Sequence, residues 1–224
     1  MFVFEGPLSL AFFGAPLSES SGAARCVSAN RALRYAVDMY GLINKAVEGL
    51  VRTRFGDAAW SRILAKAGLP DEPFMSMEQY PDKTTYDLVG AATEVLGAPA
   101  ELILEEFGRF WTVYTAEAGY GELMKSAGST LPEFLGNLDQ LHTRVKLSFP
   151  HLKPPSFSVS EQATDSLVLH YYSERPGLAP LVVGLLKGLG DRFGLEVEAT
   201  WERVDSGRPH DRFRVRWHPK GVAA

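Results

Sequence analysis

Residues 130–175 read TLPEFLGNLDQLHTRVKLSFPHLKPPSFSVSEQATDSLVLHYYSER, and within this stretch one periodicity gives way to another. Its first part, TLPEFLGNLDQLHTRV, has helical spacing and opens with the capping-box pattern of Thr130 and Glu133. After Pro154 and Pro155, SFSVSEQ and SLVLHYYS alternate apolar and polar residues, as strands of a half-exposed antiparallel sheet do. The stretch therefore joins a helical region to a region that contains a sheet.

Helical periodicity also extends upstream of this junction. We expect helices at about residues 41–55, 57–67, 84–96 and 99–117, separated by segments that contain glycine or proline. Downstream, LEVEATWERV and RFRVRWH predict two further strands, with a helix at about 180–193 between the strands. The pattern predicts an α+β fold, in which a helical N-terminal subdomain precedes an antiparallel sheet with helices.

The composition is that of one ordinary globular domain. Of the 224 residues, 46% are hydrophobic and 22% are charged, and the formal net charge is −4. This charge gives no reason to expect nucleic acid as a partner, and no apolar run reaches the ~18 residues of a membrane span. Cys26 is the only cysteine, which excludes an intramolecular disulfide, so we expect a protein of the reducing cytoplasm.

Residues 1–38 differ from the rest, because they are rich in Gly, Ala, Ser and Pro and lack a long periodic pattern. LSLAFFGAPL resembles a signal-peptide core, but Glu5 precedes it where a basic residue is expected. Periodicity begins at Met39. We interpret residues 1–38 as an N-terminal extension that is disordered or arises from start-codon choice, with a regulatory arm as the alternative. Residues 39–224 are then the functional domain.

His142 shares the apolar stripe of its predicted helix with Leu135, Leu138 and Val145. A lone histidine in such a position is more often a core imidazole that is hydrogen-bonded to a neighbour. The alternative is an iron ligand, since neutral imidazole holds the haem iron of globins and peroxidases. Taken alone, His142 does not decide between the two.

Tyr171, Ser173 and Arg175 alternate at the end of the same stretch. Positions i, i+2 and i+4 of a strand point to one face, so we expect a phenol, a hydroxyl and a guanidinium to project together, without a balancing acid. Such a set suits a carboxylate or a phosphate, which arginine can bind through two hydrogen bonds. The two propionates of haem would fit it. The alternative is a strand end with an ordinary solvated arginine.

These residues carry a resemblance to a known family. From Met39 onward the chain resembles the haem nitric oxide/oxygen binding (H-NOX) family, and it is similar in particular to the haem domain of the beta subunit of soluble guanylate cyclase. The similar segments include MYGLINKAVEGLV, KTTYDLVGAATEVLG and LHYYSERPGLAPLVVGLLKGL, and together the similar segments cover nearly all of residues 39–217. The LDxLH helix, the Pro-Pro pair and the Tyr-x-Ser-x-Arg motif are specific in combination, whereas each alone is a weak signal.

The resemblance implies an H-NOX fold that holds haem b between its two parts. His142 matches the proximal iron ligand of the family. Tyr171, Ser173 and Arg175 match its propionate-binding motif, and Pro155 matches the proline that presses on the porphyrin and distorts it.

The resemblance also implies which residues line the distal side of the haem. Leu181 stands where oxygen-binding members have a tyrosine that donates to dioxygen, and the other distal candidates, Ile43, Val47 and Trp111, are apolar or bulky. Dioxygen would lack a stabilising donor there, whereas nitric oxide binds ferrous iron without one. Tyr114, one helical turn from Trp111, would weaken this argument if its hydroxyl reached the pocket.

We therefore expect a haem-based sensor rather than an enzyme. It would bind nitric oxide, and also carbon monoxide, exclude oxygen, and signal through movement of the helix that carries His142. Since the chain ends soon after the last predicted strand, we expect a separate partner, such as a histidine kinase or a cyclic-di-GMP enzyme. Three alternatives stay open. They are an oxygen sensor of the same family, a haem enzyme, for which a distal His/Arg pair is lacking, and a haem-free ligand-binding module of the same fold.

The remaining charged features are interpreted as structural. His151, His170, His210 and His218 look incidental, because no pair has the helical i, i+4 spacing of a zinc site. RFRVRWH reads as a strand with a solvated basic face, and a docking surface for an acidic partner is the alternative.

Overall fold

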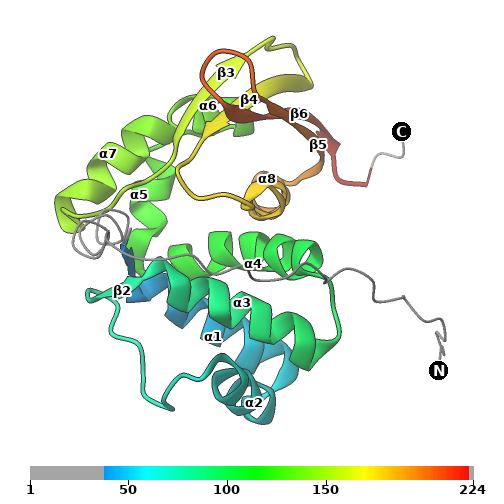
Figure 1. Ribbon diagram of the computed structural model, residues 1–224. Helices are drawn as coiled ribbons and strands as arrows, with labels where there is room; N and C mark the ends of the chain where they lie inside the picture. Colours follow the sequence, from blue (N-terminus) through cyan, green and yellow to red (C-terminus); the bar gives the residue numbers. More distant parts are fainter. Residues whose placement is uncertain (1–37, 222–224) are drawn as a thin grey trace, which may run out of the picture. The chain divides into compact units, whose positions relative to one another are not determined.

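The computed structural model of the protein describes residues 38–221 (Figure 1). The expectation for residues 1–38 therefore lies outside the described residues, apart from Asp38, and so does Cys26. Among the described residues, no helix has the length and apolar character needed to cross a membrane.

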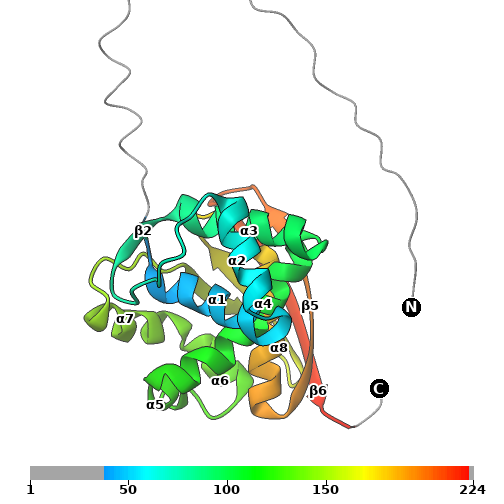
Figure 2. The same cartoon turned by 90° about the horizontal axis from the view of Figure 1, so that it is seen from below.

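The first part of the described chain is helical, as predicted. Its four main helices are α1 (Gly41–Phe55), α2 (Asp57–Ala67), α3 (Asp82–Leu96) and α4 (Ala100–Thr115). Trp60, Ile63 and Leu88 are almost completely buried, because α2 and α3 turn their apolar faces toward each other and toward α1. Figure 2, seen from the helical side, shows α1 and α2 nearest the viewer.

A small sheet within this part was not expected. β1 (Asp38–Tyr40) pairs antiparallel with β2 (Gln79–Pro81), and Met39 lies opposite Tyr80. Strands of three residues show too little alternation to be recognised from the sequence. The pairing ties the start of α1 to the start of α3.

The helix expected from Thr130 to about residue 147 is in fact two helices. Its start is confirmed, because the Thr130 side chain accepts the backbone N–H of Glu133. However, α6 (Leu131–Gly136) ends before Asn137, and α7 (Leu138–Ser148) begins after it. The Asn137 side chain donates to the carbonyl oxygen of Ala127 at 2.8 Å, which holds the chain at the break.

The segment between α4 and α6 is also more irregular than expected. Where a helix up to residue 117 is predicted, α4 gives way to a π-helical turn, η2 (Ala116–Tyr120), which is followed by α5 (Gly121–Lys125). Gly119 has φ 99° inside the turn, so the regular helix cannot continue through it.

The second part contains a four-stranded antiparallel sheet in the order β3-β4-β6-β5. Its strands are β3 (Ser156–Ser160), β4 (Ser166–Tyr172), β5 (Leu195–Val204) and β6 (His210–Pro219). The helix α8 (Ala179–Phe193) connects β4 to β5 and covers one face of the sheet (Figure 1). Leu186 of α8 packs there with Leu169 and Phe213, which are buried. The α+β fold is confirmed.

The helical part and the sheet part meet where α4 crosses α8. Gly108 of α4 and Gly184 of α8 lie at the crossing, because a Cβ at either position would overlap backbone atoms of the other helix. Two ion pairs flank the crossing, Arg109 with Asp191 at 2.6 Å and Lys187 with Glu105 at 2.5 Å. The backbones therefore approach closely, and the position of α4 on α8 is tightly defined.

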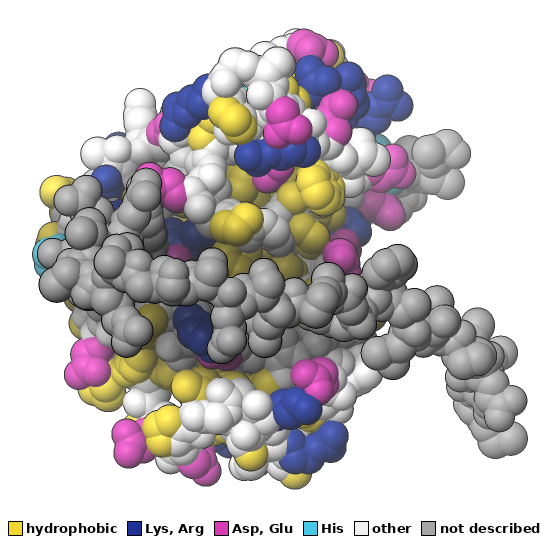
Figure 3. All heavy atoms as spheres, in the orientation of Figure 1, with side chains coloured by type: hydrophobic (Ala, Val, Ile, Leu, Met, Phe, Trp, Pro, Cys, Tyr) yellow, Lys and Arg dark blue, Asp and Glu magenta, His cyan; other side chains and the backbone are white. Residues whose placement is uncertain are grey.

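Basic side chains of β6 and β5 are paired with acids across the sheet. Arg212 donates to Glu202 at 2.8 Å, and Arg203 donates to Asp211 at 3.1 Å. Acidic and basic side chains lie next to one another at the top of Figure 3, over the sheet. This mixture favours an ordinary solvated face over a docking surface for an acidic partner.

Candidate functional site

His142 lies in the second turn of α7 and is half-buried. Its Nδ1 is buried and has no hydrogen-bond partner among residues 38–221. Burial lowers the pKa of His142, and the backbone of Pro155 partly opposes this shift. The imidazole is therefore neutral at pH 7, which is the form that binds a metal ion.

The orphaned nitrogen fits a metal ligand. A buried polar atom without a partner is costly, so it calls for an explanation. A metal-bound imidazole uses one ring nitrogen for the metal and donates the N–H of the other nitrogen to an acceptor, often a backbone carbonyl. Pro155, whose backbone already acts on the ring of His142, supplies such a carbonyl.

Phe157 links His142 to Tyr171. The ring centroids of His142 and Phe157 are 5.7 Å apart, and those of Phe157 and Tyr171, which face each other across β3 and β4, are 5.3 Å apart. The carboxylate of Asp139 accepts the backbone N–H of Phe157 at 2.7 Å and so ties α7 to β3. Sequence reasoning missed both Asp139 and Phe157, although Asp139 is the acid of the LDxLH motif.

Of the three predicted donors, only Tyr171 projects from a strand. Because β4 ends at Tyr172, Ser173 and Arg175 lie in the following loop, and the expected common strand face is wrong. The loop still brings the three together. Ser173 Oγ accepts the backbone N–H of Arg175 at 3.0 Å. Burial raises the pKa of Tyr171, while Ser173, which lies nearby, partly opposes the rise.

The expected absence of a balancing acid is also wrong. Arg175 donates from Nε and Nη2 to the carboxylate of Asp82, at the start of α3, over 2.8 and 3.2 Å. Its Nη1 donates to the carbonyl oxygen of Lys153 at 3.0 Å. No local pattern could have indicated the pair, since Asp82 and Arg175 are 93 positions apart.

The four predicted distal residues gather in one apolar cluster within the helical part. The cluster takes Ile43 and Val47 from α1, Trp111 from α4 and Leu181 from α8. Three helices that are far apart in the sequence therefore converge there, and one of them, α8, also packs against the sheet.

Tyr114 belongs to the same cluster. Its ring stacks on that of Trp111, with 6.2 Å between the centroids. Burial raises the pKa of Tyr114, and Glu48 and Tyr120 raise it further, so the phenol keeps its proton at neutral pH. A hydroxyl donor thus lies next to one of the predicted distal residues.

Two of the histidines that look incidental in the sequence form a partly buried chain of hydrogen bonds. Because the carbonyl of Arg208 can only accept, Nδ1–H of His210 donates to it at 3.0 Å, which leaves Nε2 of His210 as an acceptor. His170 Nδ1–H then donates to this Nε2 at 2.9 Å, and Ser160 Oγ–H donates to His170 Nε2 at 2.8 Å. The chain is complete with both imidazoles neutral.

This chain of hydrogen bonds predicts that the stability of the protein depends on pH. Burial, and then His210 and Arg212, lower the pKa of His170, while Glu161 raises it. The folded protein therefore binds fewer protons than the unfolded chain below about pH 6.5, and stability falls as the pH drops through that value. In His170→Gln, the free energy of unfolding, measured by denaturant titration from pH 7 to 5, should fall less steeply. The difference in slope is at most about 1.4 kcal/mol per pH unit for one proton.

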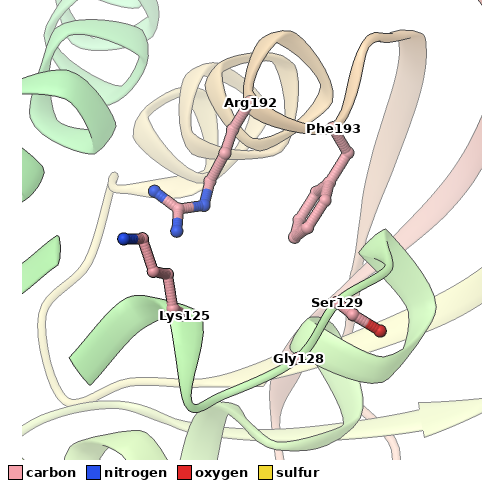
Figure 4. Close-up of a pocket in the computed structure, with 5 residues that line it drawn as sticks. All are labelled: Lys125, Gly128, Ser129, Arg192 and Phe193. Carbon is pink, nitrogen blue, oxygen red and sulfur yellow. The ribbon is translucent and has the colours of Figure 1, made fainter. Parts of the chain in front are cut away.

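A surface pocket lies apart from the residues that the sequence singles out. It measures about 490 Å³ and is lined by Lys125, Gly128, Ser129, Arg192 and Phe193. Figure 4 shows Lys125 and Arg192 pointing toward the same space. Lys125 is paired with Glu122 at 2.6 Å, and the lining contains neither an imidazole nor a carboxylate. The pocket is therefore not the candidate metal site.

Comparisons with known proteins point to one family. The sequence model of the Haem-NO-binding family matches residues 40–201. Soluble guanylate cyclase gcy-35 of Caenorhabditis elegans is 35% identical over 159 residues, which cover 69% of this chain and 23% of that protein. Soluble guanylate cyclase gcy-31 of the same organism is 28% identical over 167 residues, or 75% of this chain and 24% of that protein. The chain thus spans about a quarter of the length of these relatives.

A solved structure supports the fold. The H-NOX protein from S. oneidensis in the Fe(II)NO ligation state matches with a TM-score of 0.71 and 20% sequence identity, over 80% of this chain and 99% of that chain. At this level of identity, the likeness shows the fold.

Proposed function

The chain belongs to the Haem-NO-binding family, whose domains bind haem and sense gases, and on this premise we propose that it is a sensor that binds nitric oxide and excludes oxygen. The proposal includes a ferrous haem b that is ligated by His142, in a domain that spans residues 39–224. One observation carries it: the Nδ1 of His142 is buried and has no hydrogen-bond partner within the described chain, while the backbone of Pro155 lies close enough to act on the same ring, as the outer partner of a metal ligand would.

Each predicted residue then has a role in holding the group. Bound haem would supply a ferrous iron with one open position for a diatomic gas. His142 would hold the iron from α7, and Pro155 would shape the wall beside it. Tyr171, Ser173 and Arg175 would donate to the two carboxylates, since they form one cluster at the end of β4.

The helix α7 is suited to pass on a signal. None of its residues is fully buried, and its Asp139 and His142 both reach β3 at Phe157. With His142 bound to iron, α7 would be fixed at two points one helical turn apart. With His142 released from iron, only the hydrogen bond between Asp139 and the backbone of Phe157 would remain. This gives two arrangements of one helix, which is the element that a switch requires. A separate histidine kinase or cyclic-di-GMP enzyme is the partner we propose, and the domain itself would not be catalytic.

The gas selectivity follows from the distal cluster. Leu181, Ile43 and Val47 offer no hydrogen-bond donor to a bound dioxygen, so among the four predicted distal residues only the indole N–H of Trp111 could stabilise it, whereas nitric oxide needs no donor. A second candidate, an oxygen sensor of the same family, is favoured by one observation, the hydroxyl of Tyr114 beside Trp111. Carbon monoxide should bind in either case.

Absorption spectra of the reduced protein test the proposal. We expect a Soret band typical of five-coordinate ferrous haem, a shift of that band with nitric oxide or carbon monoxide, and no stable oxygen complex in air. Leu181→Tyr should slow oxygen release, because it replaces an apolar predicted distal side chain by a hydroxyl donor, while Tyr114→Phe should behave as wild type. A stable oxygen complex in the wild type that is lost in Tyr114→Phe would favour the oxygen sensor instead.

A further inference from the structure

Arg175 is attached to the helical part of the protein by a nearly buried ion pair. Its guanidinium meets the Asp82 carboxylate through two nitrogens, and the two side chains are only 13% and 16% exposed. A bidentate pair in such surroundings is much stronger than an exposed one, because solvent screens it little. Its geometry fixes the plane of the guanidinium.

A second contact joins the same two segments one helical turn further along α3. The Tyr86 hydroxyl donates to the carbonyl oxygen of Pro176 at 3.0 Å. Burial raises the pKa of Tyr86, the Asp82 charge raises it further, and the Arg175 charge lowers it. Tyr86 therefore lies close to both partners of the ion pair, and α3 contacts the loop after β4 at two successive positions.

The ion pair changes what Arg175 can offer to a ligand. A guanidinium carries one positive charge, and the Asp82 carboxylate already balances it. A ligand carboxylate that approaches Arg175 is attracted by the guanidinium but repelled by Asp82, at a distance where the surroundings screen little. Two acids that share one arginine therefore each bind it less tightly than either would alone.

We propose that Asp82 competes with the carboxylates of the cofactor for Arg175, and thereby sets how tightly the protein holds haem. The inference rests on the proposed function, and it adds a positioning residue from α3 to the site. It also implies that loading of the cofactor weakens the attachment of α3 to the loop after β4. Cofactor occupancy is thereby linked to the helical part of the protein.

The test measures haem loss with and without ligand carboxylates. Ferric protein is loaded with haem or with haem dimethyl ester, which lacks the two charges, and transfer to an excess of apomyoglobin gives the dissociation rate. The variant Asp82→Asn removes the competing charge and keeps the shape. Asp87→Asn is the matched control, since Asp87 lies on the same helix and its ion pair within the described residues is with exposed Lys83, at 2.6 Å.

We expect the ester to leave wild type and Asp87→Asn only about threefold faster than haem does, because Arg175 is largely neutralised. In Asp82→Asn, haem should leave about tenfold more slowly than from wild type, while ester loss is unchanged. The unloaded Asp82→Asn protein should also melt at a lower temperature, since the substitution removes the Asp82 charge that faces the nearly buried Arg175.

Equal or faster haem loss from Asp82→Asn would overturn the inference. So would a wild-type protein that releases the ester about thirtyfold or more faster than haem, a measurement that does not depend on the variant folding. Both results leave the proposed function intact if wild type shows its Soret band. Failure of wild type to take up haem at all would overturn the proposed function and this inference with it.

Discussion

Replacing His142 by glycine should abolish stable haem binding, and free imidazole should restore it. The substitution removes the only predicted iron ligand and leaves a space of the size of the lost ring in α7. We expect haem affinity to fall by at least about 100-fold, since even loss of a residue that merely supports a metal ligand costs 10–100-fold. The effect is measured from the Soret band of the reduced protein, after purification and desalting with or without millimolar imidazole.

His151→Gly is the matched control for this experiment. His151 is an exposed histidine in the loop between α7 and β3, so the same change there should leave the Soret band intact. If His142→Gly bound haem as wild type does, with the same five-coordinate spectrum and no response to imidazole, another residue would be the ligand. The signalling role proposed for α7 would then be untenable, because iron would not hold that helix.

The sequence predicts those elements whose signals are local. The ends of α1 and α2 fall at Gly56 and Gly68, as expected, because both glycines take a positive φ, of 82° and 68°, which ends a helix and which other residues rarely adopt. The strands β3 to β6 are confirmed because alternation is a property of each strand alone. The Thr130 cap likewise involves only its own helix.

What the sequence does not predict depends on contacts between distant segments. The break at Asn137 is held by the carbonyl of Ala127, in a different element. β4 stops at Tyr172 because its partner β3 begins opposite, at Ser156, and no signal in LHYYSER itself marks that end. The pairing of Arg175 with Asp82 joins the two parts of the protein and could be found only in three dimensions.

The candidate site shows the same division. Residue types that suit iron and carboxylates were recognisable in one stretch, and the structure does bring Tyr171, Ser173 and Arg175 together. Their surroundings come from the packing of α7 on β3. There the ring of Phe157 lies between the rings of His142 and Tyr171, and Asp139 accepts the backbone N–H of Phe157. The residue types that suit the site can thus be recognised in the sequence, whereas the residues that orient them are set by the fold.

The second large effect concerns the crossing of α4 and α8. Gly184→Ala should destabilise the protein by about 3 kcal/mol or more, because the new methyl group would overlap the carbonyl group of Glu105 and force the helices apart. Flexible side chains could move aside, but a backbone carbonyl within α4 cannot. Chemical denaturation monitored by circular dichroism would measure the loss.

Gly90→Ala provides the opposite expectation from the same chemical change. Gly90 lies inside α3, where a Cβ would meet nothing within 4 Å, so alanine should stabilise the protein by about 0.5–1 kcal/mol through helix propensity. Equal effects of the two substitutions would mean that α4 and α8 do not pack as closely as described. Since α4 carries Trp111 and α8 carries Leu181, a wider crossing would also separate two of the predicted distal residues, and haem uptake by Gly184→Ala should fall together with its stability.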